Sequence, residues 1–259
     1  MIVAAYQGFS PEGNIESALA TVDRTLAKAA NEDVEMLVFP ELYFPGYNQM
    51  NSHPVVAQKQ GGSWETKLAA LAKKHGCGLT IGWAERDGDS IYNSASTFDR
   101  AGTKLAHFRK IQLWGKTEQE IFEFGDSYVT FELAGIKIGL LICYDVEFPQ
   151  HVQALAQMGV QLVLVPTANP ENFSIVNTTL VPARASENAM TIVYTNYCGS
   201  DNGLSFCGQS TIVGPLAQPL ASAGPDDEDL LIADLSSINK IDAALISTQL
   251  TDFRKVPTK

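Results

Sequence analysis

The chain has 259 residues, 45% of them hydrophobic, and a formal net charge of −11. This apolar content is enough for a sizeable core and excludes a disordered protein. The negative charge opposes binding to nucleic acids and to anionic membranes, and the longest apolar runs are too short to span a bilayer. We therefore expect neither nucleic acid nor membrane as a partner. The length is compatible with a single domain over residues 1–259.

The cysteines and histidines indicate a protein with reduced thiols and no metal. None of the four cysteines forms a C-x-x-C pair, and the chain opens without a basic leader or a small-residue cleavage site. This pattern favours a cytoplasmic location. The four histidines show no metal-ligand spacing, so we expect no zinc site.

In the first half of the chain, predicted strands alternate with predicted helices. The helical spacing of apolar residues predicts helices at residues 14–30 and 65–74. Short apolar or alternating runs predict strands at residues 2–6, 36–39, 79–81, 90–98 and 104–108. The last two strands flank an Asp-Arg-Ala-Gly turn, so we expect them to pair as a hairpin.

The second half is richer in predicted strands. A helix is expected to begin near Phe148-Pro149, another spans 182–190, and residues 220–228 predict a surface turn. Strands are predicted at residues 128–133, 136–143, 161–166, 191–196, 208–213 and 230–235. The mixture indicates an α/β fold with helices covering the sheet. A Rossmann-type fold is compatible with this pattern, but no G-x-G-x-x-G loop follows a strand.

Three residues with reactive side chains lie where predicted strands end: Glu41, Lys110 and Cys143. Strand ends are where α/β folds assemble their sites. Cys143 ends a very apolar predicted strand and precedes a helix start, a position where a nearby cation would favour the thiolate. Considered alone, Cys143 is more simply interpreted as a small buried hydrophobic residue, as are Cys77, Cys198 and Cys207.

Glu41 and Lys110 also have two interpretations each. Glu41 lies among aromatic and proline residues, where desolvation would raise its pKa toward a range useful for proton transfer. The Lys110 ammonium could stabilise a developing oxyanion. Considered alone, Glu41 is more simply a surface or helix-capping residue, and Lys110 a solvated residue at a strand end.

Taken together, these segments resemble the nitrilase superfamily of carbon–nitrogen hydrolases. Phe39-Pro40-Glu41 is similar to the glutamate motif of the family, Phe108-Arg109-Lys110 to its lysine motif, and residues 143–149 (Cys-Tyr-Asp-Val-Glu-Phe-Pro) to its nucleophile motif. The motifs occur in the family's order, and the resemblance covers essentially the whole chain. The family also has a second glutamate before a Phe-x-x-Gly-Asp segment, here 122–126. Glu118 matches that spacing best and Glu120 is the alternative, while a charged surface turn would explain both.

The resemblance implies an αββα sandwich that forms a four-layer αββα–αββα dimer. It also implies hydrolysis of a small amide without metal or organic cofactor. In the implied mechanism Glu41 takes the proton of Cys143, whose thiolate attacks the amide carbon while Lys110 and the Tyr144 N–H hold the oxyanion. Ammonia leaves, and water activated by Glu41 releases the acid from a thioester, with Glu118 orienting the groups.

Within the family, residues 166–170, 196–199 and 206–210 resemble the short amidases that include 5-aminopentanamidase and the stereoselective amidases. The implied substrate is an aliphatic or ω-amino carboxamide, and Glu147 is a candidate to bind an ammonium group. The full set of candidate pocket residues is Tyr47, Trp114, Tyr144, Glu147 and Asn169. Each of these residues also has a structural interpretation. Core packing would explain the aromatic residues Tyr47 and Trp114, a helix-cap role would explain Glu147, and a position in a turn would explain Asn169.

Three alternatives to an amidase stay open on the sequence. A nitrilase would consume a nitrile, and an N-carbamoyl hydrolase would release CO₂. A catalytically inactive binding protein belongs to a different class, and the intact set of Glu41, Lys110 and Cys143 argues against it.

Overall fold

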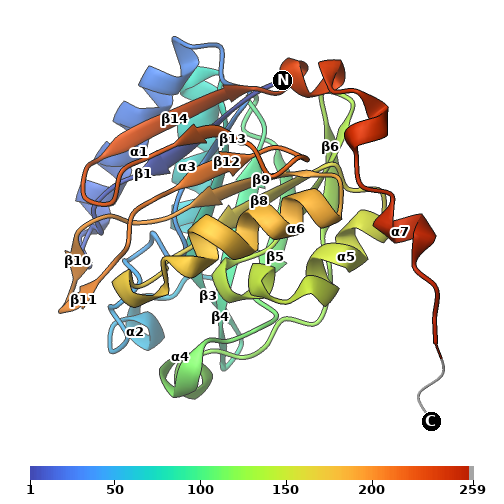
Figure 1. Ribbon diagram of the computed structural model, residues 1–259. Coiled ribbons are helices and arrows are strands. Elements are labelled where there is room, and N and C mark those ends of the chain that lie inside the picture. Colours follow the sequence, from blue (N-terminus) through green and yellow to red (C-terminus); the bar gives the residue numbers. More distant parts are fainter. Residues whose placement is uncertain (257–259) are drawn as a thin grey trace.

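Two six-stranded sheets pack face to face in the computed structural model, which describes residues 1–256 (Figure 1). The first sheet has the order β14-β1-β2-β3-β4-β5, formed by Asp229–Asp234, Ile2–Gln7, Met36–Val38, Gly78–Asp87, Ser90–Phe98 and Lys104–Arg109. The second has the order β13-β12-β9-β8-β7-β6, formed by Pro219–Ser222, Thr211–Val213, Thr191–Thr195, Leu162–Pro166, Ile136–Leu140 and Thr130–Leu133. A separate small hairpin joins β10 (Ser200–Asp201) and β11 (Leu204–Ser205).

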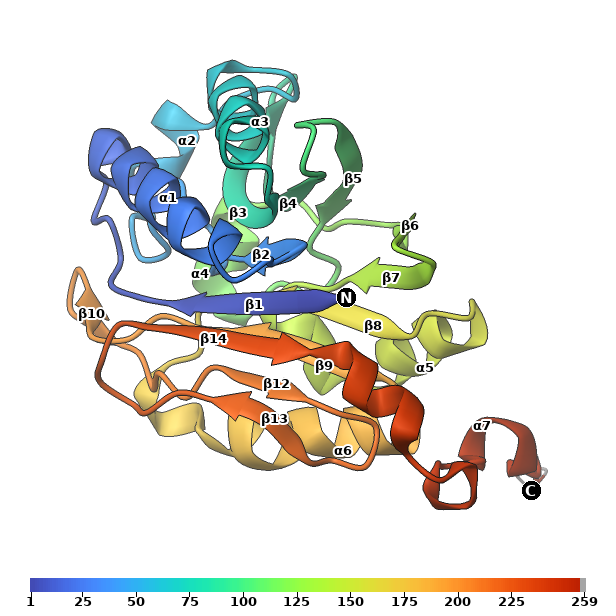
Figure 2. The ribbon, with the colours of Figure 1, turned by 90° about the horizontal axis from the view of Figure 1, so that it is seen from above.

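Helices cover the outer face of each sheet, which gives four layers in the order α, β, β, α (Figure 2). The helices α1 (Ile15–Ala30) and α3 (Ser63–His75) lie on the first sheet, and α5 (Pro149–Gln157) and α6 (Val181–Glu187) on the second. The shorter helices are α2 (His53–Val56), α4 (Gly115–Ile121) and α7 (Gln249–Asp252). The predicted α/β sandwich is confirmed, while the four-layer dimer stays a prediction.

The longest helix, α1, shows how the sequence builds the outer layers. The Asn14 side chain accepts a hydrogen bond from the Ser17 N–H, which caps the first turn. Its buried positions repeat at helical spacing and face the first sheet: Ala18, Val22, Thr25, Leu26 and Ala29. One apolar cluster lies beneath α1 and α3, and a second fills the space between the sheets and beneath α5 and α6.

The direction of the strands brings their carboxyl ends to one edge of the sandwich. Strands β1, β2 and β3 are parallel in the first sheet, and β7, β8 and β9 are parallel in the second. Strand β5 runs the same way as β3, since both are antiparallel to β4. The Glu41 N–H donates to the Thr167 carbonyl at 3.3 Å, which joins the segments that follow β2 and β8. The strand ends that carry the predicted reactive residues therefore meet.

Several predicted elements differ in extent from the observed ones; the strand predicted at 79–81, for example, spans Gly78–Asp87. The strand predicted at 136–143 ends at Leu140, because the Ile142 N–H bonds to the Asp145 side chain instead of continuing the ladder. The turn predicted at 220–228 is partly a strand, because residues 219–222 pair with β12 at the sheet edge, where a proline is tolerated. The sequence pattern also did not predict α2, α4, α7 or the β10–β11 hairpin.

In the part of the chain described here, no helix is both long and apolar enough to cross a bilayer.

Substitution of Leu26 tests the packing of α1 on the first sheet. Leu26 is fully buried, so Leu26→Ala should lower the free energy of unfolding by about 2–5 kcal/mol. Urea denaturation measures this change, with Leu245→Ala as the control because Leu245 is 64% exposed. Equal effects of the two substitutions would contradict the packing described for α1.

Candidate active site

Lys110 lies between two carboxylates beneath the surface of the protein. Its Nζ is 2.6 Å from Glu41 Oε1 and 2.8 Å from both carboxylate oxygens of Glu118. All three side chains are at most 1% exposed. Asn93 donates to Glu41 Oε1 at 2.7 Å, and the Tyr47 hydroxyl donates to Glu118 Oε1 at 2.6 Å. The cluster is thus a dry, hydrogen-bonded network of one ammonium and two carboxyl groups.

The charges of this cluster decide where its protons reside. Burial alone would lower the pKa of Lys110, but the carboxylates of Glu118 and Glu41 raise it well above its usual value, so it remains an ammonium. Burial raises the pKa of Glu41, and the Glu118 charge adds to this rise while Lys110 opposes it. Glu41 Oε2 is buried and has no hydrogen-bond partner among the described residues. This oxygen is therefore the position in the cluster that is suited to accept a proton.

Cys143 opens a 3₁₀ turn, Cys143–Glu147, rather than ending a strand. Its φ of +46° lies in the left-handed region, which is uncommon for residues other than glycine and is found often at functional sites. The predicted bias toward thiolate is wrong: burial and the Glu41 charge raise the pKa of the Cys143 thiol well above its usual value, and Lys110 offsets only part of this rise. The resting group is a thiol that needs a base.

The segments around Glu41 and Lys110 are held by close backbone packing. A Cβ on Gly82 of β3 would lie 2.4 Å from the Leu42 backbone N, so the loop that carries Glu41 rests directly on that strand. Gly125 donates to the Lys110 carbonyl at 2.7 Å, and a Cβ there would lie 2.1 Å from the Arg109 carbonyl oxygen. The glycine of the Phe-x-x-Gly-Asp segment thus braces the residue that carries the ammonium.

The structure distinguishes the two candidates for the second glutamate. Glu118 is buried in α4, and its Oε2 also accepts the Trp114 N–H at 2.9 Å. Glu120 is exposed. Sequence reasoning missed Asn93 on β4 and Tyr197, whose hydroxyl donates to the Glu41 carbonyl at 2.8 Å. Tyr197 lies in the stretch 196–199 that resembles the short amidases, but neither its contact with Glu41 nor that of Asn93 could be inferred, because each bond joins segments far apart in the sequence.

A cavity of about 180 Å³ opens above Cys143, which is 8% exposed. All five predicted pocket residues line it: Tyr47, Trp114, Tyr144, Glu147 and Asn169. Ala168, Pro170 and Phe173 complete the wall and were not predicted. The rings of Trp114 and Phe173 meet edge to face. The cavity is small, four of its nine lining residues are aromatic, and its lining includes one carboxylate, that of Glu147.

Two polar residues of this wall have defined surroundings. Glu147 is half-buried, and Arg184 donates to its backbone carbonyl at 2.8 Å. Helix α5 begins after Phe148 with no side-chain cap, so the interpretation of Glu147 as a helix cap is wrong. Asn169 uses its side-chain N–H groups within the protein, where it donates to the Phe173 carbonyl and to Asn177 Oδ1. Asn169 therefore holds the 169–177 segment that forms one wall.

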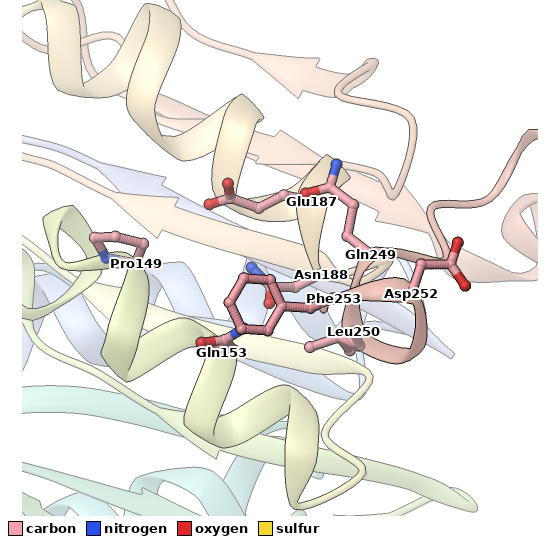
Figure 3. A pocket seen from close by; sticks show the side chains of 8 residues that line it. All are labelled: Pro149, Gln153, Glu187, Asn188, Gln249, Leu250, Asp252 and Phe253. Carbon is pink, nitrogen blue, oxygen red and sulfur yellow. The ribbon is translucent and has the colours of Figure 1, made fainter. Parts of the chain in front are cut away.

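A second pocket, of about 310 Å³, lies between α5, the end of α6 and α7 (Figure 3). Its lining includes none of the predicted site residues: Pro149, Gln153, Glu187, Asn188, Gln249, Leu250, Asp252 and Phe253. Within residues 1–256, no three His, Cys, Asp or Glu side chains converge in a way that suits a metal ion. Of these two pockets, the smaller one is thus the one whose lining includes Cys143, and the buried Glu41 and Lys110 lie within electrostatic reach of that thiol.

Comparison with known proteins agrees with this site. The chain is 35% identical to an (R)-stereoselective amidase from Pseudomonas sp., over 75% of the chain and 71% of that protein. It is 32% identical to a nitrilase from Pyrococcus abyssi, over 91% and 90%. The crystal structure of an amidase from Nesterenkonia sp. superposes with a TM-score of 0.89 and 34% identity, over 98% of this chain and 93% of that one. In a variant of that amidase, the acetamide moiety of fluoroacetamide is covalently added at the active-site cysteine.

The sequence also matches a family model over nearly its full length. The model describes the carbon–nitrogen hydrolases and matches residues 2–240. The resemblance to the nitrilase superfamily, predicted from three motifs, is thereby confirmed. This chain belongs to the carbon–nitrogen hydrolase family.

Proposed function

We propose that the chain is a cysteine amidase that converts a small carboxamide and water to a carboxylic acid and ammonia. The observation that carries the proposal is the unpartnered, buried Oε2 of Glu41 in the same cluster as Lys110, with the Cys143 thiol within electrostatic reach of both. Base, cation and nucleophile are the groups that acyl transfer through a thioester requires. Their convergence beneath one small cavity supports amide chemistry there.

The first half-reaction forms the thioester. Glu41 takes the proton of the Cys143 thiol as the sulfur attacks the amide carbon, and the carbonyl oxygen becomes an oxyanion. Lys110 and the Tyr144 backbone N–H, which lies in the first turn of the 3₁₀ helix and has no intrahelical acceptor, stabilise that charge. Glu41 then gives its proton to the nitrogen as the carbon–nitrogen bond breaks, and ammonia leaves.

The second half-reaction releases the acid. Water attacks the thioester carbon and Glu41 takes one of its protons. The carbon–sulfur bond then breaks, and the proton returns from Glu41 to the sulfur. Glu118 takes no proton in this scheme: it receives hydrogen bonds from Lys110, Tyr47 and the Trp114 N–H, and so orients the ammonium.

The cavity supports a short substrate. Its volume of about 180 Å³ suits a few heavy atoms beyond the carboxamide, and its aromatic wall suits a methylene chain. Glu147 would bind a terminal ammonium, which favours an ω-amino amide over a neutral one. Burial raises the pKa of Glu147, while Lys110 and Arg184 oppose this rise, so binding of a cation should strengthen as Glu147 ionises.

We also propose that the chain folds as one unit, in the cytoplasm, and forms a homodimer or a higher homo-oligomer. The pairing of β1 with β14 supports the single unit, because it joins segments from opposite ends of the sequence in one sheet. The four buried free thiols, Cys77, Cys143, Cys198 and Cys207, are compatible with a reducing compartment. Sedimentation at several concentrations would test the dimer.

Cys143→Ala should abolish ammonia release while the protein stays folded. Loss of a covalent nucleophile costs about 10⁶-fold in turnover where it has been measured. Ammonia release is measured over a screen of short aliphatic, ω-amino and amino-acid amides. The melting temperature of each protein then shows whether it stays folded. Cys77→Ala is the matched control because that buried thiol lies outside the cavity lining.

Near-normal turnover by Cys143→Ala would rule out the thioester scheme. Each amide is paired with the corresponding nitrile, and release of ammonia from the nitrile alone would favour a nitrilase, in keeping with the similarity to the Pyrococcus abyssi protein. Release of CO₂ from N-carbamoyl compounds would favour an N-carbamoyl hydrolase.

Glu147→Gln should weaken selectivity for cationic substrates. For 5-aminopentanamide we expect kcat/KM to fall about 10- to 100-fold, the size of one charge-assisted hydrogen bond, because the carboxylate is lost. Hexanamide, a neutral substrate of matched length, serves as the control and should change little. Equal losses for both amides would show that Glu147 does not recognise the ammonium.

A further inference from the structure

One carboxylate outside the proposed catalytic set connects the two loops that carry Lys110 and Cys143. Asp145 is fully buried, and its Oδ1 accepts the Gln112 N–H at 2.6 Å. Its Oδ2 accepts the Ile142 N–H at 3.0 Å. Gln112 lies two residues after Lys110, and Ile142 directly precedes Cys143. One side chain that belongs to neither sheet thus links the loop that carries the ammonium to the loop that carries the thiol.

Both N–H groups lie where the regular backbone ladders have ended. Strand β7 stops at Leu140 and β5 at Arg109, so a buried N–H at these positions needs an acceptor from elsewhere. The Asp145 N–H in turn donates to the Ile142 carbonyl at 3.0 Å, which tightens the turn that holds Cys143 at its positive φ. Asp145 is therefore well placed to maintain an unfavourable backbone conformation.

The side chain of Gln112, in the loop that follows β5, makes a second set of contacts. Gln112 Nε2 lies 3.0 Å from His151 Nε2 on α5, and His151 Nδ1 lies 2.7 Å from the Tyr128 hydroxyl. The loop is consequently anchored by its backbone to Asp145 and by its side chain to α5. Its position does not depend on Lys110 alone.

We propose that Asp145 is a positioning residue for amide hydrolysis, whose ionised carboxylate holds Cys143 in register with Lys110 by accepting the Ile142 and Gln112 N–H groups. The proposal rests on the proposed function of Cys143 as nucleophile. A carboxylate accepts both bonds. An amide presents its NH₂ donor to one of the two N–H groups and loses that bond, and the hydroxyl oxygen of a neutral carboxyl group is a weaker acceptor than a carboxylate oxygen.

The charged groups that face Asp145 determine when it is ionised. Burial raises its pKa to about 7, the Ile142 and Gln112 N–H groups and the Lys110 ammonium oppose this rise, and the Glu41 charge adds to it. Burial raises the pKa of the Tyr128 hydroxyl, and the Asp145 charge adds to this rise. Wild-type kcat should therefore fall as the pH decreases through about 7, as the ionised form is lost.

Asp145→Asn is the direct test, because it keeps the shape and removes one acceptor. We expect kcat to fall about 100-fold, with KM changed little, since displacement of a reacting group by about 1 Å costs this much while the cavity wall is unaltered. Alkylation of Cys143 by iodoacetamide, located by mass spectrometry, should slow in parallel. Asp99→Asn is the matched control: Asp99 also accepts two backbone N–H groups, those of Ala101 and Thr103 at 2.8 Å, but in the β4–β5 turn.

Stability separates positioning from a merely structural role. The folded-state pKa of Asp145 is raised, so its ionisation lowers the stability of the wild type as the pH rises from about 4 to about 7. The melting temperature of Asp145→Asn relative to wild type should thus shift in favour of the variant between about pH 5.5 and about pH 8, although the variant is the less active protein. A structural role predicts that stability and activity are lost together at both pH values.

If Asp145→Asn does not fold, the wild type still tests the proposal. The amide resonances of Ile142 and Gln112 should titrate together with the acid limb of kcat, while those of Ala101 and Thr103 should not. A kcat that stays constant through that titration overturns the proposal, as does an Asp145→Asn protein with wild-type kcat. Absence of amidase activity in the wild type would instead contradict the proposed function, which keeps the two failures distinguishable.

Discussion

The ion cluster around Lys110 is the interaction on which the rest of the site depends. Two carboxyl groups that are at most 1% exposed lie within 2.8 Å of the Lys110 ammonium, and pairing of this kind offsets the large cost of burying an unpaired charge. Each member comes from a different segment: Glu41 follows β2, Lys110 follows β5 and Glu118 lies in α4. The electrostatic requirement therefore fixes three loops relative to one another.

The two-sheet architecture supplies these loops at one edge. Parallel strands in each sheet end on the same side, and face-to-face packing brings the end of β7 near those of β2 and β5. The cost of the arrangement is visible in the backbone and side chains. Cys143 has a positive φ and Glu41 Oε2 lacks a partner among the described residues. Strain and unsatisfied groups of this kind persist where the surrounding structure over-determines them, and they concentrate at functional sites.

The groups proposed to react in this site are buried away from solvent. Burial raises the pKa of both the Cys143 thiol and Glu41, so the proposed nucleophile lies within electrostatic reach of the proposed base without being a free thiolate. A protonated thiol is also less open to adventitious oxidation. The small aromatic cavity limits which molecules reach the sulfur, and the Glu147 carboxylate is its one anionic wall residue.

The sequence by itself determined the family and the α/β class and indicated candidates for the reactive residues, because each motif is a short run of neighbouring residues. Glu41, Lys110 and Cys143 could be found in this way, and so could the five pocket residues that flank the motifs. Tertiary structure alone decided the end of β7 and the protonation of Cys143. A local pattern shows a helix start beside the cysteine, whereas the depth of burial and the nearby Glu41 charge come from segments about a hundred residues away. Asn93, Tyr197 and the Gln112–Asp145 contact were invisible for the same reason: hydrogen bonds between distant segments exist only once the sheets have packed.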